Sequence, residues 1–109
     1  MGSRNADGKE RRFDLRVTYP ANRRAALVTT RLRFELVDIS QGGFRMLDEA
    51  DRCPAAGITG DIELLCGVKL AVEARREWAQ NGQIGFSLKR LLNSDVLEKE
   101  KRYVILHYE

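Results

Sequence analysis

The sequence is poor in the residues from which catalytic and metal sites are usually built. Its 109 residues include one histidine, His107, and two cysteines, Cys53 and Cys66, that lack the Cys-x-x-Cys spacing of a metal site. No serine–histidine–aspartate or cysteine–histidine set can be assembled, and there is no P-loop and no Gly-x-Gly-x-x-Gly motif. We therefore expect a protein that is not an enzyme, holds no metal or cofactor and keeps both thiols reduced.

Long apolar runs are also missing. No stretch approaches the roughly 18 residues that a transmembrane helix needs, and the N-terminus is too polar for a signal peptide. The composition is otherwise that of a folded protein, with 43% hydrophobic and 32% charged residues, and the length suits one domain. We expect a single cytoplasmic domain without a membrane span.

Lysine is scarce where positive charge is densest. Residues 1–33 hold nine Lys or Arg against three Asp or Glu, and eight of the nine are arginine; the remainder holds ten against thirteen. Such an asymmetry indicates an anionic partner, and arginine has a flat fork that pairs with phosphate or a guanine edge and stacks on a base. Residues 1–11 lack apolar periodicity, so we expect them to form a flexible basic arm before a domain that spans 12–109.

Alternation of apolar and polar residues predicts a mainly β fold. Six segments have strand signals: Leu15–Tyr19, Val28–Leu36, Phe44–Asp48, Asp61–Cys66, Lys69–Trp78 and Gln83–Lys89. Gly42-Gly43 and Asn81-Gly82 are typical of tight turns between strands, and 51–59 has the composition of a loop. Six strands at this spacing favour a small six-stranded antiparallel β-barrel.

The alternation in Lys69–Trp78 also predicts which side chains face the core. It places Trp78 on the face of Leu70, Val72 and Ala74, so we expect the indole to pack mainly in the core. Arg76 falls on the same face, where an apolar residue is expected.

The C-terminal segment has the signals of a helix. Asn93 or Ser94 can cap it, and Asp95 lies where the helix dipole favours an acid. We expect a helix over about 93–107 that covers one end of the barrel with Val96, Leu97 and 104–106. The β-branched and aromatic content of Tyr103–Tyr108 leaves a terminal strand as an alternative there.

Two short motifs carry the clearest functional signal. Arg12-Phe-Asp-Leu-Arg16 has the form Arg-x-x-x-Arg and follows Arg11, and Asp38-Ile-Ser-Gln-Gly-Gly43 has the form Asp-x-Ser-x-x-Gly. Taken by themselves, the arginines are either solvated surface residues or anion ligands, and the second motif is either a turn or a polar site.

Together and in this order, the motifs resemble those of the PilZ domain family, whose members are bacterial receptors for the second messenger cyclic di-GMP. The run from Trp78 to Phe86, with its Gly-Gln-Ile-Gly-Phe ending, is similar to the hairpin that closes the barrel of that family. The resemblance spans Arg11 to Leu92. It implies a single-domain β-barrel whose ligand-binding residues are Arg11, Arg12, Arg16, Asp38, Ser40 and Gly43, with Gly42 and Trp78 near the site.

The resemblance implies that Arg12 and Arg16 grip phosphate and a guanine edge, and that Arg11 goes with an intercalated pair of ligands. A bidentate arginine reads O6 and N7 of guanine. Asp38 can accept from guanine N1 and N2 at the opposite edge, which adenine cannot satisfy.

The function expected is therefore a cyclic di-GMP receptor or adaptor. Binding would close the N-terminal arginine arm onto the barrel and signal to an effector protein that the sequence does not identify. Two alternatives stay open: a small basic barrel that binds RNA or single-stranded DNA, and a PilZ-like protein-interaction domain that binds no ligand. A nucleic-acid-binding barrel requires exposed aromatic side chains along a sheet, whereas aromatic residues make up only 7% of this chain. Nucleic acid is thus the less expected partner.

Overall fold

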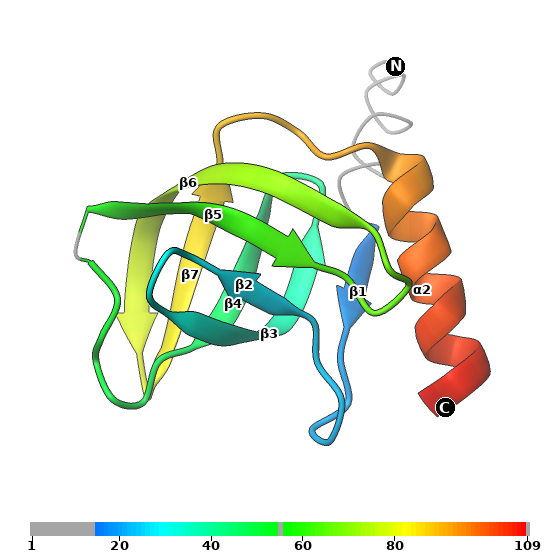
Figure 1. Cartoon of the computed structure of the whole chain (residues 1–109), viewed down its shortest axis with the longest axis horizontal. Coiled ribbons are helices and arrows are strands. Elements are labelled where there is room, and N and C mark those ends of the chain that lie inside the picture. The colour runs from blue at the N-terminus through cyan, green and yellow to red at the C-terminus, as the bar shows by residue number, and fades with distance from the viewer. Residues whose placement is uncertain (1–14, 55, 109) are drawn as a thin grey trace, which may run out of the picture.

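The structure of the protein is a computed structural model, which describes residues 15–54 and 56–108. These residues form seven strands and one helix (Figure 1). The elements are β1 (Arg16–Thr18), β2 (Ala26–Val28), β3 (Arg33–Ser40), β4 (Gly43–Leu47), β5 (Gly57–Glu63), β6 (Lys69–Gln80), β7 (Gln83–Leu88) and α2 (Ser94–Tyr108).

Six of the strands close into an antiparallel barrel. Their order is β3-β2-β5-β6-β7-β4, and β4 pairs back onto β3 to complete the ring. The remaining strand, β1, pairs with residues 38–40 of β3, beyond the point where β2 pairs with residues 33–35. Figure 1 shows β1 between the barrel and α2. The predicted six-stranded antiparallel barrel with a C-terminal helix is confirmed.

The barrel is filled by apolar side chains from every strand. Phe44 and Phe86, on the paired strands β4 and β7, stack with ring centroids 5.1 Å apart. Phe34, Leu36 and Ile62 are at most 2% exposed. Period-two alternation puts these side chains inside and leaves their neighbours on the outer wall, where a site can form.

One predicted strand is in fact a hairpin. The segment Val28–Leu36 alternates without a break, but β2 ends at Val28 and β3 starts at Arg33. The Thr29 hydroxyl accepts hydrogen bonds from the N–H groups of Arg31 and Leu32, and the Thr29 N–H donates to the Leu32 carbonyl at 2.8 Å. A threonine side chain thus closes the turn, and it leaves no interruption in the hydrophobic pattern.

The predicted strand Asp61–Cys66 lies too far along the chain. The observed strand, β5, begins at Gly57, and residues 64–68 form the turn into β6. Gly57 lies in the segment 51–59 that was expected to be a loop, but neighbouring backbone explains both Gly57 and Gly60. A Cβ at Gly57 would lie 2.6 Å from the carbonyl oxygen of Ala74, and one at Gly60 would lie 2.6 Å from that of Val28.

The hairpin between β6 and β7 agrees with the sequence prediction. Its loop is Asn81-Gly82, and both residues have positive φ, 53° and 76°. This is the conformation that Asn-Gly favours between two strands, because it matches their twist.

The C-terminal element is helical to Tyr108, so the alternative of a terminal strand is wrong. The Asn93 side chain accepts from the N–H of Asp95 at 2.7 Å and caps the helix. The expected packing face is partly correct. Leu97 and Val104 are buried, whereas Ile105 and Leu106 are 47% and 72% exposed, because Ile105 lies at the side of the buried face and Leu106 lies opposite it.

Glu100 joins this helix to two other parts of the fold. Its carboxylate is fully buried and accepts hydrogen bonds from the Tyr19 hydroxyl at 2.6 Å and from the N–H groups of Leu65 and Cys66, both at 2.8 Å. Burial, and next the hydrogen bond to Glu100, raise the pKa of Tyr19 far above its usual value.

Among the described residues, no helix is long and apolar enough to cross a membrane.

Candidate functional site

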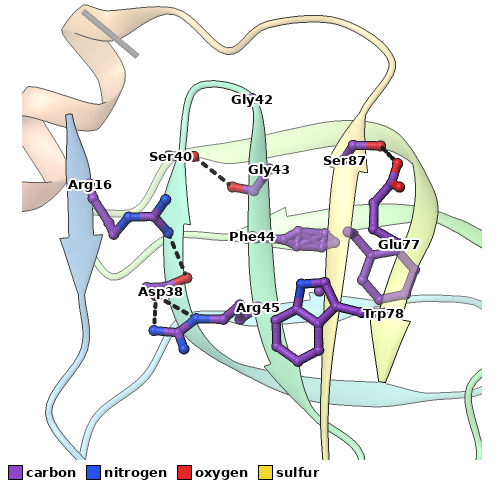
Figure 2. A pocket seen from close by; sticks show the side chains of 12 residues that line it. Arg16, Asp38, Ser40, Gly42, Gly43, Phe44, Arg45, Glu77, Trp78 and Ser87 are labelled. Carbon is purple, nitrogen blue, oxygen red and sulfur yellow. Dashed lines mark hydrogen bonds and ion pairs between the residues drawn. The ribbon is translucent and has the colours of Figure 1, made fainter. Parts of the chain in front are cut away.

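A cavity of about 450 Å³ opens on the outer wall of the barrel (Figure 2). Twelve residues from β1, β3, β4, β6, β7 and the β3–β4 turn line it. They are Arg16, Asp38, Ser40, Gly42, Gly43, Phe44, Arg45, Glu77, Trp78, Gly85, Phe86 and Ser87.

The cavity brings together six of the eight residues predicted from the sequence. Arg16 reaches it from β1, Asp38 and Ser40 from β3, and Gly42 and Gly43 from the turn into β4, while Trp78 comes from β6. The other two, Arg11 and Arg12, lie outside the described residues.

Asp38 is the centre of charge in the cavity. Its side chain is fully buried, and Arg45 donates to its Oδ2 from Nε at 2.7 Å and from Nη2. Arg16 Nη1 lies 3.2 Å from Oδ1, an ion-pair distance, but it is not oriented for a hydrogen bond. Oδ1 therefore has no hydrogen-bond donor among the residues that the structure describes.

Both arginines keep one side toward solvent. The side chains of Arg16 and Arg45 are 50% and 41% exposed, whereas Asp38 is 0% exposed. The hydrogen bond to Asp38 raises the pKa of Arg45, and burial opposes this to a smaller extent. The carboxylate is thus screened from water by groups that a ligand can reach.

Arg45 was missed in the sequence. Alternation along β4 puts Arg45 on the outward face, and this is the only sequence signal for it. Arg45 pairs with Asp38 in the hairpin, but the register of this pair includes a bulge. Leu36 pairs with Met46 and Asp38 with Arg45, so Val37 is the extra residue. Without this bulge, Asp38 would share the inward face of Leu36.

The Asp-x-Ser-x-x-Gly turn holds itself together. The Ser40 hydroxyl donates to the carbonyl of Gly43 at 3.3 Å, as a turn-forming serine does. A Cβ at Gly43 would lie 2.3 Å from the carbonyl oxygen of Phe86 on β7, so close contact between strands already requires glycine there. At Gly42 the nearest atom to such a Cβ is Leu91 Cδ2, at 3.8 Å.

Trp78 lies on the outer wall, and the prediction of a mainly buried indole is wrong. A second bulge is the cause, since Arg76 pairs with Phe86 and Trp78 with Gly85, which leaves Glu77 as the extra residue. The indole is 42% exposed and covers Gly85, where a Cβ would lie 2.2 Å from the indole nitrogen. One face of the ring thus rests on backbone and the other is available for stacking.

Glu77, which was also missed, adds a carboxylate at the far side of the cavity. It accepts a hydrogen bond from the hydroxyl of Ser87 (Figure 2) and one from Arg75 Nε at 3.2 Å. These two bonds, that of Ser87 first, lower the pKa of Glu77. Alternation along β6 places Glu77 on the outer wall, but no motif in the sequence marks it as a cavity residue.

The set is suited to binding. Two guanidinium groups attract an anion, the free oxygen of Asp38 accepts from an N–H donor, and Trp78 offers an aromatic surface.

Cys53 and Cys66 are free thiols, and burial raises the pKa of each. Within residues 15–54 and 56–108, no group of three or more His, Cys, Asp or Glu could hold a metal ion.

Comparison with known proteins bears on the fold. No family model and no curated protein matches this chain. Its structure is similar to the crystal structure of an uncharacterized protein of Legionella, with a TM-score of 0.57 and 12% sequence identity over 84% of this chain and 90% of that one. A similarity at this identity shows a shared fold alone.

Proposed function

We propose that this protein is a cytoplasmic receptor for cyclic di-GMP, and that it binds this ligand without transforming it. One observation carries the proposal. Arg16 from one motif and Asp38, Ser40, Gly42 and Gly43 from the other, which are far apart in sequence, line a single cavity. Either motif alone would be weak support, because such spacings arise by chance.

The chemistry of the cavity supports a guanine dinucleotide in particular. The ligand carries two phosphodiesters, which suit the exposed guanidinium groups of Arg16 and Arg45. Its guanine edge has two donors, N1–H and N2–H, for a carboxylate such as Asp38. The adenine edge presents an acceptor at N1, so cyclic di-AMP would leave Asp38 without equivalent donors.

The proposed output is closure of the N-terminal arm onto the barrel. Arg12 and Arg11 precede Arg16 by four and five residues, a length of chain short enough to bring them to a ligand held by Arg16. In this proposal the closed arm is the surface that an effector protein recognises.

Titration calorimetry of the full chain with cyclic di-GMP tests the proposal. We expect heat of binding with an affinity in the micromolar range or tighter, and a stoichiometry that separates one ligand from an intercalated pair. Cyclic di-AMP is the matched control and should give no heat. Absence of binding to cyclic di-GMP up to high micromolar concentration would overturn the proposal. Salt-dependent retention by an oligonucleotide in the same preparation would favour the RNA- or single-stranded-DNA-binding alternative.

A further inference from the structure

Asp38 receives a pair of hydrogen bonds from a side chain of the protein itself. Arg45 donates to its Oδ2 from both Nε and Nη2. The Asp38 side chain is 0% exposed, whereas that of Arg45 is 41% exposed and lines the cavity. A buried acceptor therefore has a partner whose other side faces the space where a ligand would enter (Figure 2).

The donors of Arg45 have the pattern of a guanine edge. In guanine, C2 with N1, N2 and N3 is itself a guanidine unit, and it directs the N1–H and N2–H groups in parallel, as an arginine side chain does. A guanine that approaches Asp38 with this edge competes with Arg45 for the same carboxylate.

If guanine replaces Arg45, the carboxylate of Asp38 must still receive hydrogen bonds. Removing a hydrogen-bonded partner from a buried carboxylate is strongly destabilising. Arg16 compensates part of the charge of Asp38, but it does not replace the hydrogen bonds, because its Nη1 lies at an ion-pair distance from Oδ1 without donating to it. Arg45 can therefore leave only when the incoming group brings donors of its own, and a group with one donor replaces it poorly.

We propose that Arg45 is an internal competitor for guanine: it holds Asp38 until the N1/N2 edge, which carries two donors, displaces it. This inference rests on the proposed function, since its ligand is the cyclic dinucleotide proposed above. The displaced guanidinium stays beside the cavity, where a phosphodiester can accept its hydrogen bonds.

Nitrogen-resolved NMR of the arginine Nε–H groups tests displacement in the unaltered protein. The Arg45 resonance is assigned by its loss in Arg45→Lys, and we expect it to shift as cyclic di-GMP saturates the site. If backbone resonances of the cavity shift while the Arg45 Nε–H resonance does not, this inference is overturned and the proposed function stands. If no resonance shifts, both are overturned.

Selectivity gives the second measurement. The analogue in which inosine replaces each guanosine lacks the N2 amine and offers one donor. We expect saturation with this analogue to leave the Arg45 Nε–H resonance near its position in the free protein, because a single donor does not replace the pair that Arg45 supplies.

Arg33→Met is the matched control. Arg33 lies on β3, is 62% exposed and pairs with Glu63 at 3.4 Å, outside the residues that line the cavity. In this variant the Arg45 resonance should respond to the two ligands as it does in the unaltered protein. Equal shifts of the Arg45 resonance with cyclic di-GMP and with the inosine analogue would overturn the inference that displacement needs two donors.

Discussion

Asp38 and Glu100 are both fully buried carboxylates, but they have different kinds of partner. Glu100 accepts from two backbone N–H groups and a buried tyrosine hydroxyl. Asp38 is approached by two arginine side chains that are 50% and 41% exposed, and one of its oxygens lacks a hydrogen-bond donor within the described residues. Burial alone therefore does not show whether the partners of a carboxylate are fixed or exchangeable.

The difference lies in whether the donors can be exchanged. Glu100 with its donors Tyr19, Leu65 and Cys66 is called the Glu100 junction. Two of its donors are backbone N–H groups, which the fold holds in place, so these hydrogen bonds are either kept or lost. Guanidinium groups at the edge of a cavity can move, so the partners of Asp38 can be replaced by those of a ligand. We expect substitutions at the Glu100 junction to change stability, and substitutions at the Asp38 cavity to change affinity.

The largest effect is expected from Glu100→Ala. It leaves the Tyr19 hydroxyl and the N–H groups of Leu65 and Cys66 buried without an acceptor, so the free energy of unfolding should fall by about 3–5 kcal/mol in urea denaturation. Glu98→Ala, at an exposed position of the same helix, should change it by no more than about 0.5 kcal/mol. Equal effects would mean that Glu100 does not anchor α2.

Gly43 should behave like the Glu100 junction although it lines the cavity. A methyl group there would meet the Phe86 carbonyl oxygen, so Gly43→Ala should lower the free energy of unfolding by about 1–3 kcal/mol. Gly42→Ala is the matched control, because its methyl group has space and its φ is not positive. Thermal denaturation of both variants compares them, and a stable Gly43→Ala would show that β4 and β7 can separate there.

Asp38→Ala should have the opposite profile. We expect the affinity for cyclic di-GMP to fall at least tenfold, about 1.4 kcal/mol, because the acceptor for guanine is lost. The loss of folding stability should be smaller than in Glu100→Ala, since the freed arginines can be hydrated. Calorimetry and urea denaturation measure the two quantities. Asp61→Ala, on β5 and outside the cavity lining, should keep the affinity, and a similar loss there would contradict a specific role for Asp38.

The smallest effect is a pH dependence confined to the Glu100 junction. Because the pKa of Tyr19 is raised in the folded state, the unfolded chain loses this proton first, above about pH 10. The contribution to stability is thus fully present below about pH 10, and it declines by about 1.4 kcal/mol per pH unit above it. Tyr19→Phe should remove this part of the alkaline slope in denaturation measurements, and Asp38→Ala should retain it. An unchanged slope in Tyr19→Phe would refute the assignment.

Some local features could be read directly from the sequence. Asn81-Gly82 specified a turn because both residues tolerate positive φ, and Asn93 specified the start of α2 because its side chain caps the first turn. The turn at Thr29–Leu32 escaped prediction because a threonine hydroxyl, and not a glycine or proline, closes it. Signals of this kind depend only on neighbouring residues.

The sequence predicted which residues belong to the candidate site better than it predicted how the strands arrange them. The two motifs contain Arg16, Asp38 and Ser40, but nothing near them in sequence indicated Glu77 as a cavity residue. Two bulges, at Val37 and Glu77, turn Asp38 and Trp78 to the outer wall. A bulge depends on how one strand pairs with another, so simple alternation assigned Trp78 to the wrong face and could not by itself show that Asp38 faces outward.

By itself the sequence determined a small β-barrel with a capped C-terminal helix and two motifs rich in arginine, acid and glycine. These follow from local periodicity and turn chemistry. Only the tertiary structure decided that Arg45 holds Asp38, that Trp78 is open for stacking and that Tyr19 meets Glu100 across 81 residues. The reason is that strand register and helix docking bring distant residues together, and the barrel must close before either is fixed.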